Sequence, residues 1–280
     1  MNAKRELKWQ GKTLDLSKPV IMGILNFTPD SFYDGGKLPE IRYALDHAME
    51  MVVQGAAIID IGAVSSKPFA SYVSADEEWE RLSGVLSGLR SVLPQTILSV
   101  DTFRAEIARR AAEAGADMIN DISGGQMDAD MFPLIARLGI PYIMMHMQGT
   151  PQTMQNDPKY KDVVEEVYKF FVHNLDKLKA LGSNAPVILD PGFGFGKSVE
   201  HNYQLLKSLH RFQSLECPIL AGISRKSMIN KILGIKPDDA LNGTTVLNTL
   251  CLLQGADILR VHDVKETRQA ILLVDYYRQI

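Results

Sequence analysis

The segments Gly55-Ala-Ala-Ile-Ile-Asp60, Gly115-Ala-Asp-Met-Ile-Asn120 and Gly255-Ala-Asp-Ile-Leu-Arg260 repeat one pattern: a glycine, a short apolar run and a polar residue. A glycine directly before a strand is typical of the position just past a helix, where a left-handed backbone is needed. Each segment therefore predicts a junction at which a helix ends and a buried strand begins. This weak internal repeat indicates a chain built from helix–strand units.

Short apolar runs that end in polar residues occur eight times. They cover residues 20–26, 57–62, 96–101, 117–121, 141–146, 186–190, 218–224 and 257–262. Several lack strict alternation, which is typical of strands buried on both faces. The segments between them show helical spacing, as at Ile41, Ala44, Leu45 and Ala48. Eight strands alternating with helices predict parallel pairing. For 280 residues this favours a closed (β/α)8 TIM barrel, with a doubly wound open sheet as the alternative.

The first 19 residues do not show this alternation of strands and helices. Residues 7–9 and 13–16 flank a turn-like centre at Gln10-Gly11-Lys12 and predict a short N-terminal β-hairpin. No linker or break in composition divides the chain. We therefore interpret residues 1–280 as one domain, with residues 1–19 as its hairpin extension. Ser74 and Glu77 have the spacing of a capping box that opens a helix, and Ser198 is a second candidate cap.

The composition limits the possible partners and compartments. A formal net charge of −3 gives no sign of a nucleic-acid or anionic-membrane partner. The first residues lack the apolar core of a signal peptide, and no stretch approaches the roughly 20 apolar residues of a membrane span. Cys217 and Cys251 lie in apolar runs and are interpreted as small buried hydrophobic residues. We expect a soluble protein of a reducing compartment, the cytoplasm.

Each predicted strand ends in residues that can bind a ligand. In a (β/α)8 barrel the active site lies at the carboxyl ends of the strands. The residues at those ends are Asn26, Asp60, Asp101, Asn120, Asp121, His146, Asp190, Ser224, Arg225, Lys226, Arg260 and His262. Asp60 and Asp121 are equally well explained as caps or loop anchors. Carboxylates accept hydrogen bonds, lysine donates and an amide does both, so the set suits a heteroaromatic ring with fixed N–H and C=O edges.

A smaller set at these strand ends points to phosphate. Asn26, Arg260 and His262 end the first and last strands, which are neighbours in a closed barrel. Arginine and histidine donate to phosphate oxygens, and Asn26 is a candidate ligand for Mg²⁺ that is otherwise held by phosphate and water. The segment 192–198 ends like a P-loop, but Pro191 stands where that motif needs a glycine. We interpret it as a tight turn that brings backbone and aromatic groups over a flat ligand.

Seven motifs, in order along the chain, resemble those of the dihydropteroate synthases, a family of pterin-binding enzymes. They are Met22–Gly36, Ser99–Thr102, Ile119–Gly124, Met145–Gly149, Leu189–Lys197, Gly222–Ser227 and Arg260–Asp263. The resemblance runs from about Val20 to the end of the chain. It implies that 6-hydroxymethyl-7,8-dihydropterin pyrophosphate is joined to p-aminobenzoate to give 7,8-dihydropteroate and pyrophosphate, with Mg²⁺.

The resemblance also implies a role for each site residue. The catalytic residues would be Asp101, Lys226, Arg260 and His262. The pterin would be bound by Asp101, Asn120, Met145, Asp190, Phe195, Gly222, Lys226 and Arg260. The p-aminobenzoate would be bound by Ser65, Ser66, Lys67, Pro68, Phe69 and Ser224. The pyrophosphate would be bound by Asn26, Arg260 and His262, with Asn26 as the metal ligand.

The same resemblance implies a mechanism and an assembly. Pyrophosphate would leave first, and the amine would then attack the pterin cation. The loops 27–36 and 63–72 would close to exclude water. The family also implies a homodimer through the last helices, in which Leu247, Leu250, Leu252 and Leu253 belong either to the core or to the interface.

One loop departs from the family pattern. The usual Gly-Gly-Glu-Ser-Thr-Arg-Pro-Gly reads Gly62-Ala-Val-Ser-Ser-Lys-Pro-Phe69 here. Lys67 keeps a charge without the planar fork of arginine, and Phe69 adds bulk where sulfonamides bind in this family. Two explanations fit these substitutions: lineage drift in the loop, or altered discrimination among ligands at the p-aminobenzoate position. Two alternatives follow: a degenerate pterin-binding module that is not an enzyme, and a methyltetrahydrofolate:corrinoid methyltransferase-like barrel, which needs no pyrophosphate site.

Overall fold

The computed structural model describes residues 6–27, 37–64, 73–154 and 157–280. Its main sheet has eight parallel strands in the order β8-β7-β6-β5-β4-β3-β10-β9. They are β3 (Val20–Asn26), β4 (Ile58–Gly62), β5 (Ile97–Asp101), β6 (Met118–Asp121), β7 (Tyr142–Met145), β8 (Val187–Asp190), β9 (Leu220–Ala221) and β10 (Ile258–Val261). A parallel bridge between Leu189 and Ile219 joins β8 to β9 and closes the barrel. The predicted TIM barrel is confirmed, and the open-sheet alternative is wrong.

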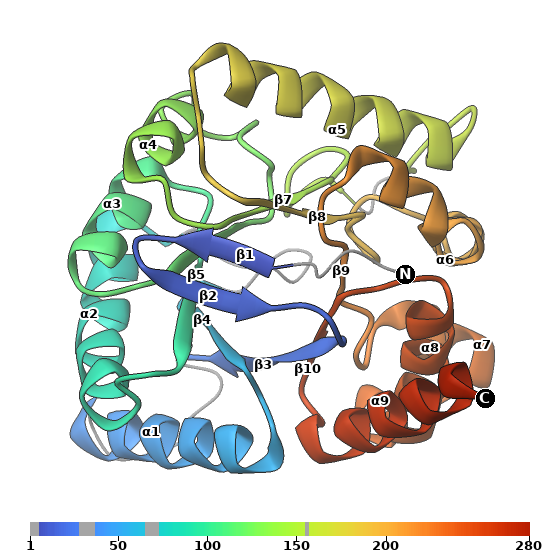
Figure 1. The fold of residues 1–280 in the computed structure, drawn as a ribbon, viewed down its shortest axis with the longest axis horizontal. Coiled ribbons are helices and arrows are strands. Elements are labelled where there is room, and N and C mark those ends of the chain that lie inside the picture. The colour runs from blue at the N-terminus through green and yellow to red at the C-terminus, as the bar shows by residue number, and fades with distance from the viewer. Residues whose placement is uncertain (1–5, 28–36, 65–72, 155–156) are drawn as a thin grey trace.

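Helices surround the strands as an outer ring (Figure 1). They are α1 (Lys37–Gln54), α2 (Ala75–Val92), α3 (Ala105–Glu113), α4 (Met131–Leu138), α5 (Val163–Ala180), α6 (Val199–Lys207), α7 (Ser227–Leu233), α8 (Leu241–Leu253) and α9 (Val264–Gln279), with short 3-10 helices η2 (Leu209–Leu215) and η3 (Pro237–Asp239). The three glycines predicted at helix ends, Gly55, Gly115 and Gly255, all have positive φ, as do Gly139 and Gly182. This conformation lets the chain leave a helix and enter the next strand without a Cβ clash.

The predicted helix caps are present, with one difference. At α6 a complete capping box forms between Ser198 and His201. At α2 the Ser74 side chain accepts from the Glu77 N–H at 3.2 Å. The Glu77 carboxylate pairs with Arg81 instead, so the structure records only the Ser74 half of the predicted box. One bonded cap is enough to satisfy an otherwise unpaired donor at the start of the helix.

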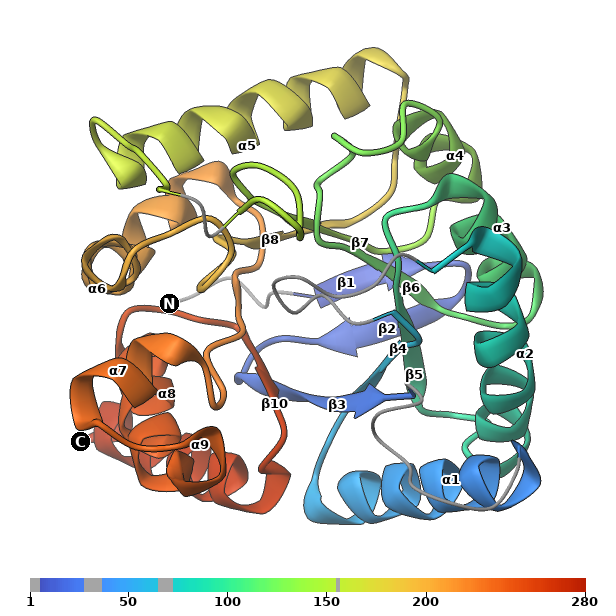
Figure 2. The ribbon, with the colours of Figure 1, turned by 180° about the vertical axis from the view of Figure 1, so that it is seen from behind.

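The N-terminal hairpin covers one end of the barrel. Strands β1 (Glu6–Trp9) and β2 (Lys12–Asp15) pair antiparallel, and Gln10 and Gly11 both have positive φ, as a two-residue type I′ turn requires. Lys12 pairs with Asp117, directly before β6. Figure 2 views the molecule from behind, with the hairpin beyond the strands. Because it seals the end where strands begin, the strand carboxyl ends remain as the mouth of the barrel.

Two details differ from the sequence prediction. The apolar run 218–224 contains a strand of only two residues, β9. The chain then leaves the sheet and turns at Arg225, whose φ is 56°. Cys251 is buried as predicted, whereas Cys217 is only half-buried. Within the described residues, no helix has both the length and the apolar character needed to cross a bilayer.

Candidate active site

Asp60, at the carboxyl end of β4, is fully buried and lies at the centre of a polar network. Its carboxylate accepts from Ser99 Oγ at 2.6 Å, from Asn120 Nδ2 at 2.9 Å and from Arg260 Nε at 2.6 Å. These partners come from β5, β6 and β10. The interpretation of Asp60 as an ordinary cap was therefore wrong, because its oxygens bind three other strands. Asp121 does behave as a loop anchor, since it accepts from Ser123, Gly125 and Tyr142.

Arg260 lies between two carboxylates. Besides the bond from Nε to Asp60, its Nη2 donates to Asp101 Oδ2 at 3.1 Å. Burial raises the pKa of Asp101 to about 7, while Arg260 opposes that shift and Asp60 adds to it. For Arg260, burial works against the charge, but Asp60 and Asp101 outweigh it and raise the pKa. The guanidinium therefore stays charged beside an acid that changes its ionisation near neutral pH.

Asp190 and Lys226 lie close enough to Arg260 for their charges to interact with it, and the segment 191–197 follows Asp190 along the chain. Burial raises the pKa of Asp190, against the attraction of Lys226, and burial lowers the pKa of Lys226 to about 8. Lys226 donates to the Phe193 carbonyl, and its ammonium lies 4.6 Å from the centre of the Phe195 ring. Gly222 adjoins these groups, because a Cβ there would be in ordinary van der Waals contact with Lys226 Nζ at 3.8 Å. Desolvated charges of this kind favour a ligand that supplies matching hydrogen bonds.

Lys197 holds the segment 191–197 in place. Its buried ammonium lies 3.0 Å from His146 Nδ1 and donates to the carbonyls of Gly192 and Phe195, each at 2.9 Å. Burial lowers the pKa of Lys197 to about 7. Gly192 has φ 71°, and a Cβ there would stand 1.9 Å from the His146 carbonyl oxygen. The tight turn predicted at this segment is thus built by glycine and by a lysine that has no phosphate role here.

An apolar wall adjoins these polar groups. It is a cluster separate from the main core and consists of Ile122, Met145, Met147 and Met154, with Phe103 and Phe195 packed against it. Met145 ends β7, and Phe195 lies in the segment 191–197. The structure thus brings the predicted Met145 and Phe195 together. A flat ring that lies on this wall would present its edges to the carboxylates and Lys226.

His262 and Asn26 lie at the rim. The Ser224 Oγ lies 3.0 Å from His262 Nδ1. Burial, followed by Arg260 and Arg225, lowers the pKa of His262 to about 4. Solvent screens this effect because the side chain is exposed. Asn26 is exposed at the end of β3, next to Gly62, and an added Cβ at Gly62 would lie 3.7 Å from Asn26 Oδ1 and 3.6 Å from Asp101 Cβ.

Some predicted residues cannot be placed. The p-aminobenzoate contacts Ser65, Ser66, Lys67, Pro68 and Phe69, and most of the two loops expected to close, lie outside the described residues. Asn26, Asp101, Asn120, Met145, Asp190, Phe195, Gly222, Ser224, Lys226, Arg260 and His262 are all described and lie at the barrel mouth. From the sequence, Asp60 was placed at a strand end without an assigned role, and Lys197 was not assigned to the site.

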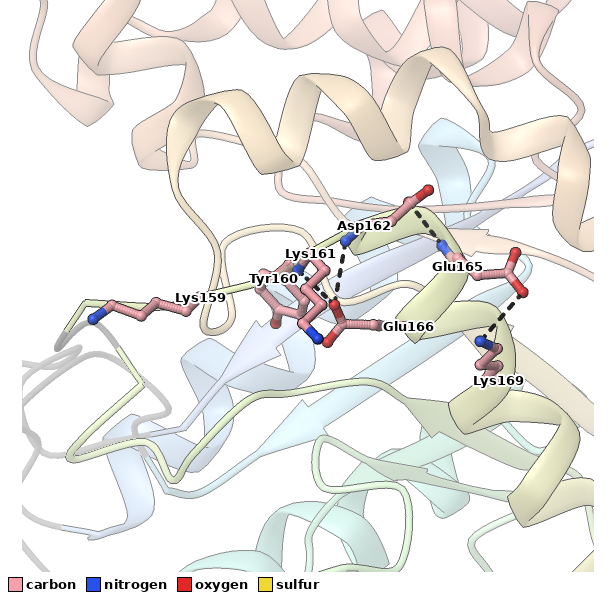
Figure 3. A pocket seen from close by; sticks show the side chains of 7 residues that line it. All are labelled: Lys159, Tyr160, Lys161, Asp162, Glu165, Glu166 and Lys169. Atoms are coloured by element: carbon pink, nitrogen blue, oxygen red, sulfur yellow. Dashed lines mark hydrogen bonds and ion pairs between the residues drawn. The ribbon is translucent and has the colours of Figure 1, made fainter.

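A surface pocket lies elsewhere, at the start of α5 (Figure 3). It is lined by Lys159, Tyr160, Lys161, Asp162, Glu165, Glu166 and Lys169. Lys169 pairs with Glu165, Glu166 accepts from the backbone N–H groups of Lys161 and Asp162, and Asp162 caps the helix. None of the strand-end residues lines it. This pocket is a solvated surface feature rather than the substrate site.

A closed barrel with such a mouth is a pterin-binding architecture, and the comparisons with known proteins agree. Residues 22–262 match the model of the pterin binding enzyme family. The chain is 44% identical to the dihydropteroate synthase of Escherichia coli K12 over 271 residues, which span 95% of this chain and 94% of that one. It is 39% identical to the dihydropteroate synthase of Streptococcus pyogenes serotype M1, covering 94% and 97% of the two chains.

Solved structures give the same result. The Yersinia pestis dihydropteroate synthase in a sulfonamide drug complex superposes with a TM-score of 0.92 at 43% identity, covering 99% of this chain and 100% of that one. The Xanthomonas albilineans dihydropteroate synthase with 4-aminobenzoic acid gives 0.92 at 37% identity, with the same coverage. The chain therefore belongs to the dihydropteroate synthases. Members of this family are enzymes, transferases of folate synthesis, and this places the chain among enzymes rather than inert pterin-binding modules or methyltransferase-like barrels.

Proposed function

We propose that the barrel mouth joins a dihydropterin pyrophosphate to p-aminobenzoate, and that the side chains described above divide this reaction between them. The observation that carries the proposal is Arg260 paired with Asp60 and Asp101, with the buried charges of Asp190 and Lys226 close enough to interact with it. One half of the mouth presents a fixed guanidinium to an anion. The other half presents an acceptor and a donor to a heteroaromatic edge. A pterin carrying a pyrophosphate has both features.

The pterin ring would lie against Met145 and Phe195. Asp190 would accept from the ring amino group and the adjacent N–H, while Lys226 would donate toward the ring carbonyl. Asn120 and Asp101 would bind the other edge. Because Asp190 and Lys226 are desolvated, a ligand that leaves either unpaired would bind poorly. Gly222, next to Arg260 and Lys226, would adjoin the ring.

The pyrophosphate would be bound by Arg260, His262 and Asn26. Arg260 remains charged between its two carboxylates, and the exposed His262 can donate to phosphate from a ring N–H even when the imidazole is neutral. The described residues contain no cluster of three or more metal-binding side chains. The single amide oxygen of Asn26 fits Mg²⁺ that takes its other ligands from phosphate and water. Mg²⁺ bound there would neutralise charge on the leaving group.

Catalysis would consist of stabilising two separated charges. As the C–O bond to pyrophosphate breaks, Arg260 and His262 would stabilise the departing anion, and the ionised Asp101 would stabilise the cation left on the pterin. The p-aminobenzoate amine, next to Ser224, would then attack the exocyclic carbon and lose a proton. No step requires a covalent bond to the protein. Sulfonamides would compete at the p-aminobenzoate position.

We propose a homodimer through α8 and α9. Leu247 and Leu252 are core residues, whereas Leu250 and Leu253 are 41% and 47% exposed. On α9, Leu272, Leu273 and Tyr276 are 58%, 71% and 68% exposed. An apolar surface of this kind is typical of an interface. A Leu273→Glu variant should shift the mass measured by light scattering toward the monomer, while Val53→Glu on α1, where Val53 is 81% exposed, should leave it unchanged. A reducing, cytoplasmic location remains our expectation.

The test of the proposed reaction is a product assay. Purified protein with dihydropterin pyrophosphate and Mg²⁺ should release pyrophosphate and form dihydropteroate only when p-aminobenzoate is added. Removal of Mg²⁺ with a chelator should slow the reaction, and restoring Mg²⁺ should recover it. Pterin binding without any dihydropteroate would contradict the proposed reaction and would direct attention to Lys67 and Phe69.

A further inference from the structure

The Asp60 carboxylate binds both Asn120 and Arg260 through one oxygen. Its Oδ2 atom accepts both from Asn120 Nδ2 and from Arg260 Nε. The other oxygen accepts from Ser99 Oγ. The residue is 0% exposed, so it can reach no substrate itself. A buried carboxylate with three donors is fixed in orientation, and its partners are fixed with it.

The bond to Asn120 decides which way the amide faces. An amide group has its donor nitrogen and its acceptor oxygen on opposite sides. Because Nδ2 donates to Asp60, Oδ1 is turned to the other side, where it can accept from an N–H of a ligand. The opposite orientation would place two N–H donors there and would suit a different edge. Asp60 therefore selects the hydrogen-bonding character of Asn120.

The bonds to Arg260 fix the guanidinium plane. Nε is bound to Asp60 on β4, and Nη2 is bound to Asp101 on β5. Two carboxylates on neighbouring strands hold the planar fork from one side. The remaining edge of the fork is thereby directed away from them. An arginine that is already oriented loses less conformational entropy when it binds an anion.

We propose that Asp60 is a positioning residue for both substrate groups: it turns the Asn120 amide toward the pterin and the Arg260 guanidinium toward the pyrophosphate. This inference rests on the proposed function and deepens it. Asp60 would act through each partner separately. Each effect should therefore vanish when that partner is removed, which distinguishes positioning from a general effect on stability.

The first binding experiment uses 6-hydroxymethyl-7,8-dihydropterin, which lacks the pyrophosphate. Asp60→Asn should raise its Kd about tenfold, the effect of one misdirected hydrogen bond. In an Asn120→Ala background the same change should alter the Kd less than about twofold. Calorimetry on the folded full chain measures both values. Equal losses in the two backgrounds would overturn the proposal.

The second binding experiment uses inorganic pyrophosphate with Mg²⁺. Asp60→Asn should weaken its binding about tenfold in the wild-type background and less than about twofold in an Arg260→Ala background. In the complete reaction, the KM for the pterin substrate should rise as well as kcat fall. An unchanged pyrophosphate affinity in Asp60→Asn would also overturn the proposal.

The matched control is Asp117→Asn at the other end of the barrel. Asp117 is likewise buried and paired with cations, so this variant should lower thermal stability while both Kd values stay unchanged.

If Asp60→Asn does not fold, Ser99→Ala replaces it. That variant removes one of the three hydrogen bonds to Asp60 and should raise the Kd for the pterin about threefold. An unchanged Kd would contradict the proposal that Asp60 positions its partners. If the wild type makes dihydropteroate but Asp60→Asn changes each Kd equally with and without Asn120 or Arg260, this inference alone is refuted. If the wild type binds neither probe, the proposed function is refuted too.

Discussion

The two ends of this barrel use the same chemistry for opposite purposes. At the hairpin end, Asp117 is held by Lys12, by Arg90 at 2.5 Å and by the Leu98 N–H at 2.9 Å. At the mouth, Asp101 shares Arg260 with Asp60, and burial raises its pKa to about 7. The hairpin end satisfies its buried acid within the protein. The mouth keeps desolvated charges that a ligand can complete, and this indicates that stability and function lie at separate ends.

The largest effect should come from Arg260. Arg260→Lys keeps a positive charge but loses the fork that lies between Asp60 and Asp101, so kcat/KM should fall about 10³-fold. The matched change Arg90→Lys at the hairpin end should leave kcat/KM within about twofold of wild type. Steady-state kinetics on both variants measure this contrast. Equal losses of activity would mean that the two ends are not separate.

Asp117 should give the converse result. Asp117→Ala leaves Arg90 and Lys12 without their buried partner, so the free energy of unfolding should fall by about 3 kcal/mol. Urea unfolding measures the change. At a temperature where the variant remains folded, kcat/KM should match the wild type. A large loss of activity in the folded variant would contradict the comparison.

Two glycines with similar backbone angles sharpen the contrast. Gly192 at the mouth and Gly139 after α4 have φ of 71° and 63°. A Cβ at Gly192 would meet the His146 carbonyl oxygen at 1.9 Å, whereas nothing lies within 4 Å of one at Gly139. Gly192→Ala should displace Phe195 and lower kcat/KM about 30-fold. Gly139→Ala should cost about 1 kcal/mol of stability without loss of activity. Similar kinetics for the two variants would argue against a shaped turn at 192–197.

The sequence predicted the barrel well because its signals are local. The glycine junctions, the eight apolar runs and the hairpin turn each depend on neighbouring residues. The role of Asp60 was missed because its partners Ser99, Asn120 and Arg260 lie 39, 60 and 200 residues away. Alone, an acid at a strand end resembles a cap. Lys197 was missed for the same reason, since His146 is 51 residues distant.

The pH dependence of kcat/KM should belong to the mouth alone. An ionised Asp101 is needed to stabilise the pterin cation, so kcat/KM should fall about tenfold per pH unit as the pH drops below about 7. A protonated Lys226 is needed as a donor, so kcat/KM should also fall as the pH rises above about 8. Asp101→Asn should remove the acidic limb, and Asp117→Asn should leave the profile unchanged. A flat wild-type profile from pH 5 to 9 would contradict these assignments.

The most direct test of the separation between the two ends is hydrogen exchange, measured with and without the dihydropterin and Mg²⁺-pyrophosphate. The account predicts that ligands slow exchange at the carboxyl ends of β4, β5, β6, β8 and β10 and in the segment 191–197. Exchange in the hairpin β1–β2 and around Asp117 should remain unchanged. Slower exchange at the hairpin, or no change at the mouth under saturating ligand, would contradict the account.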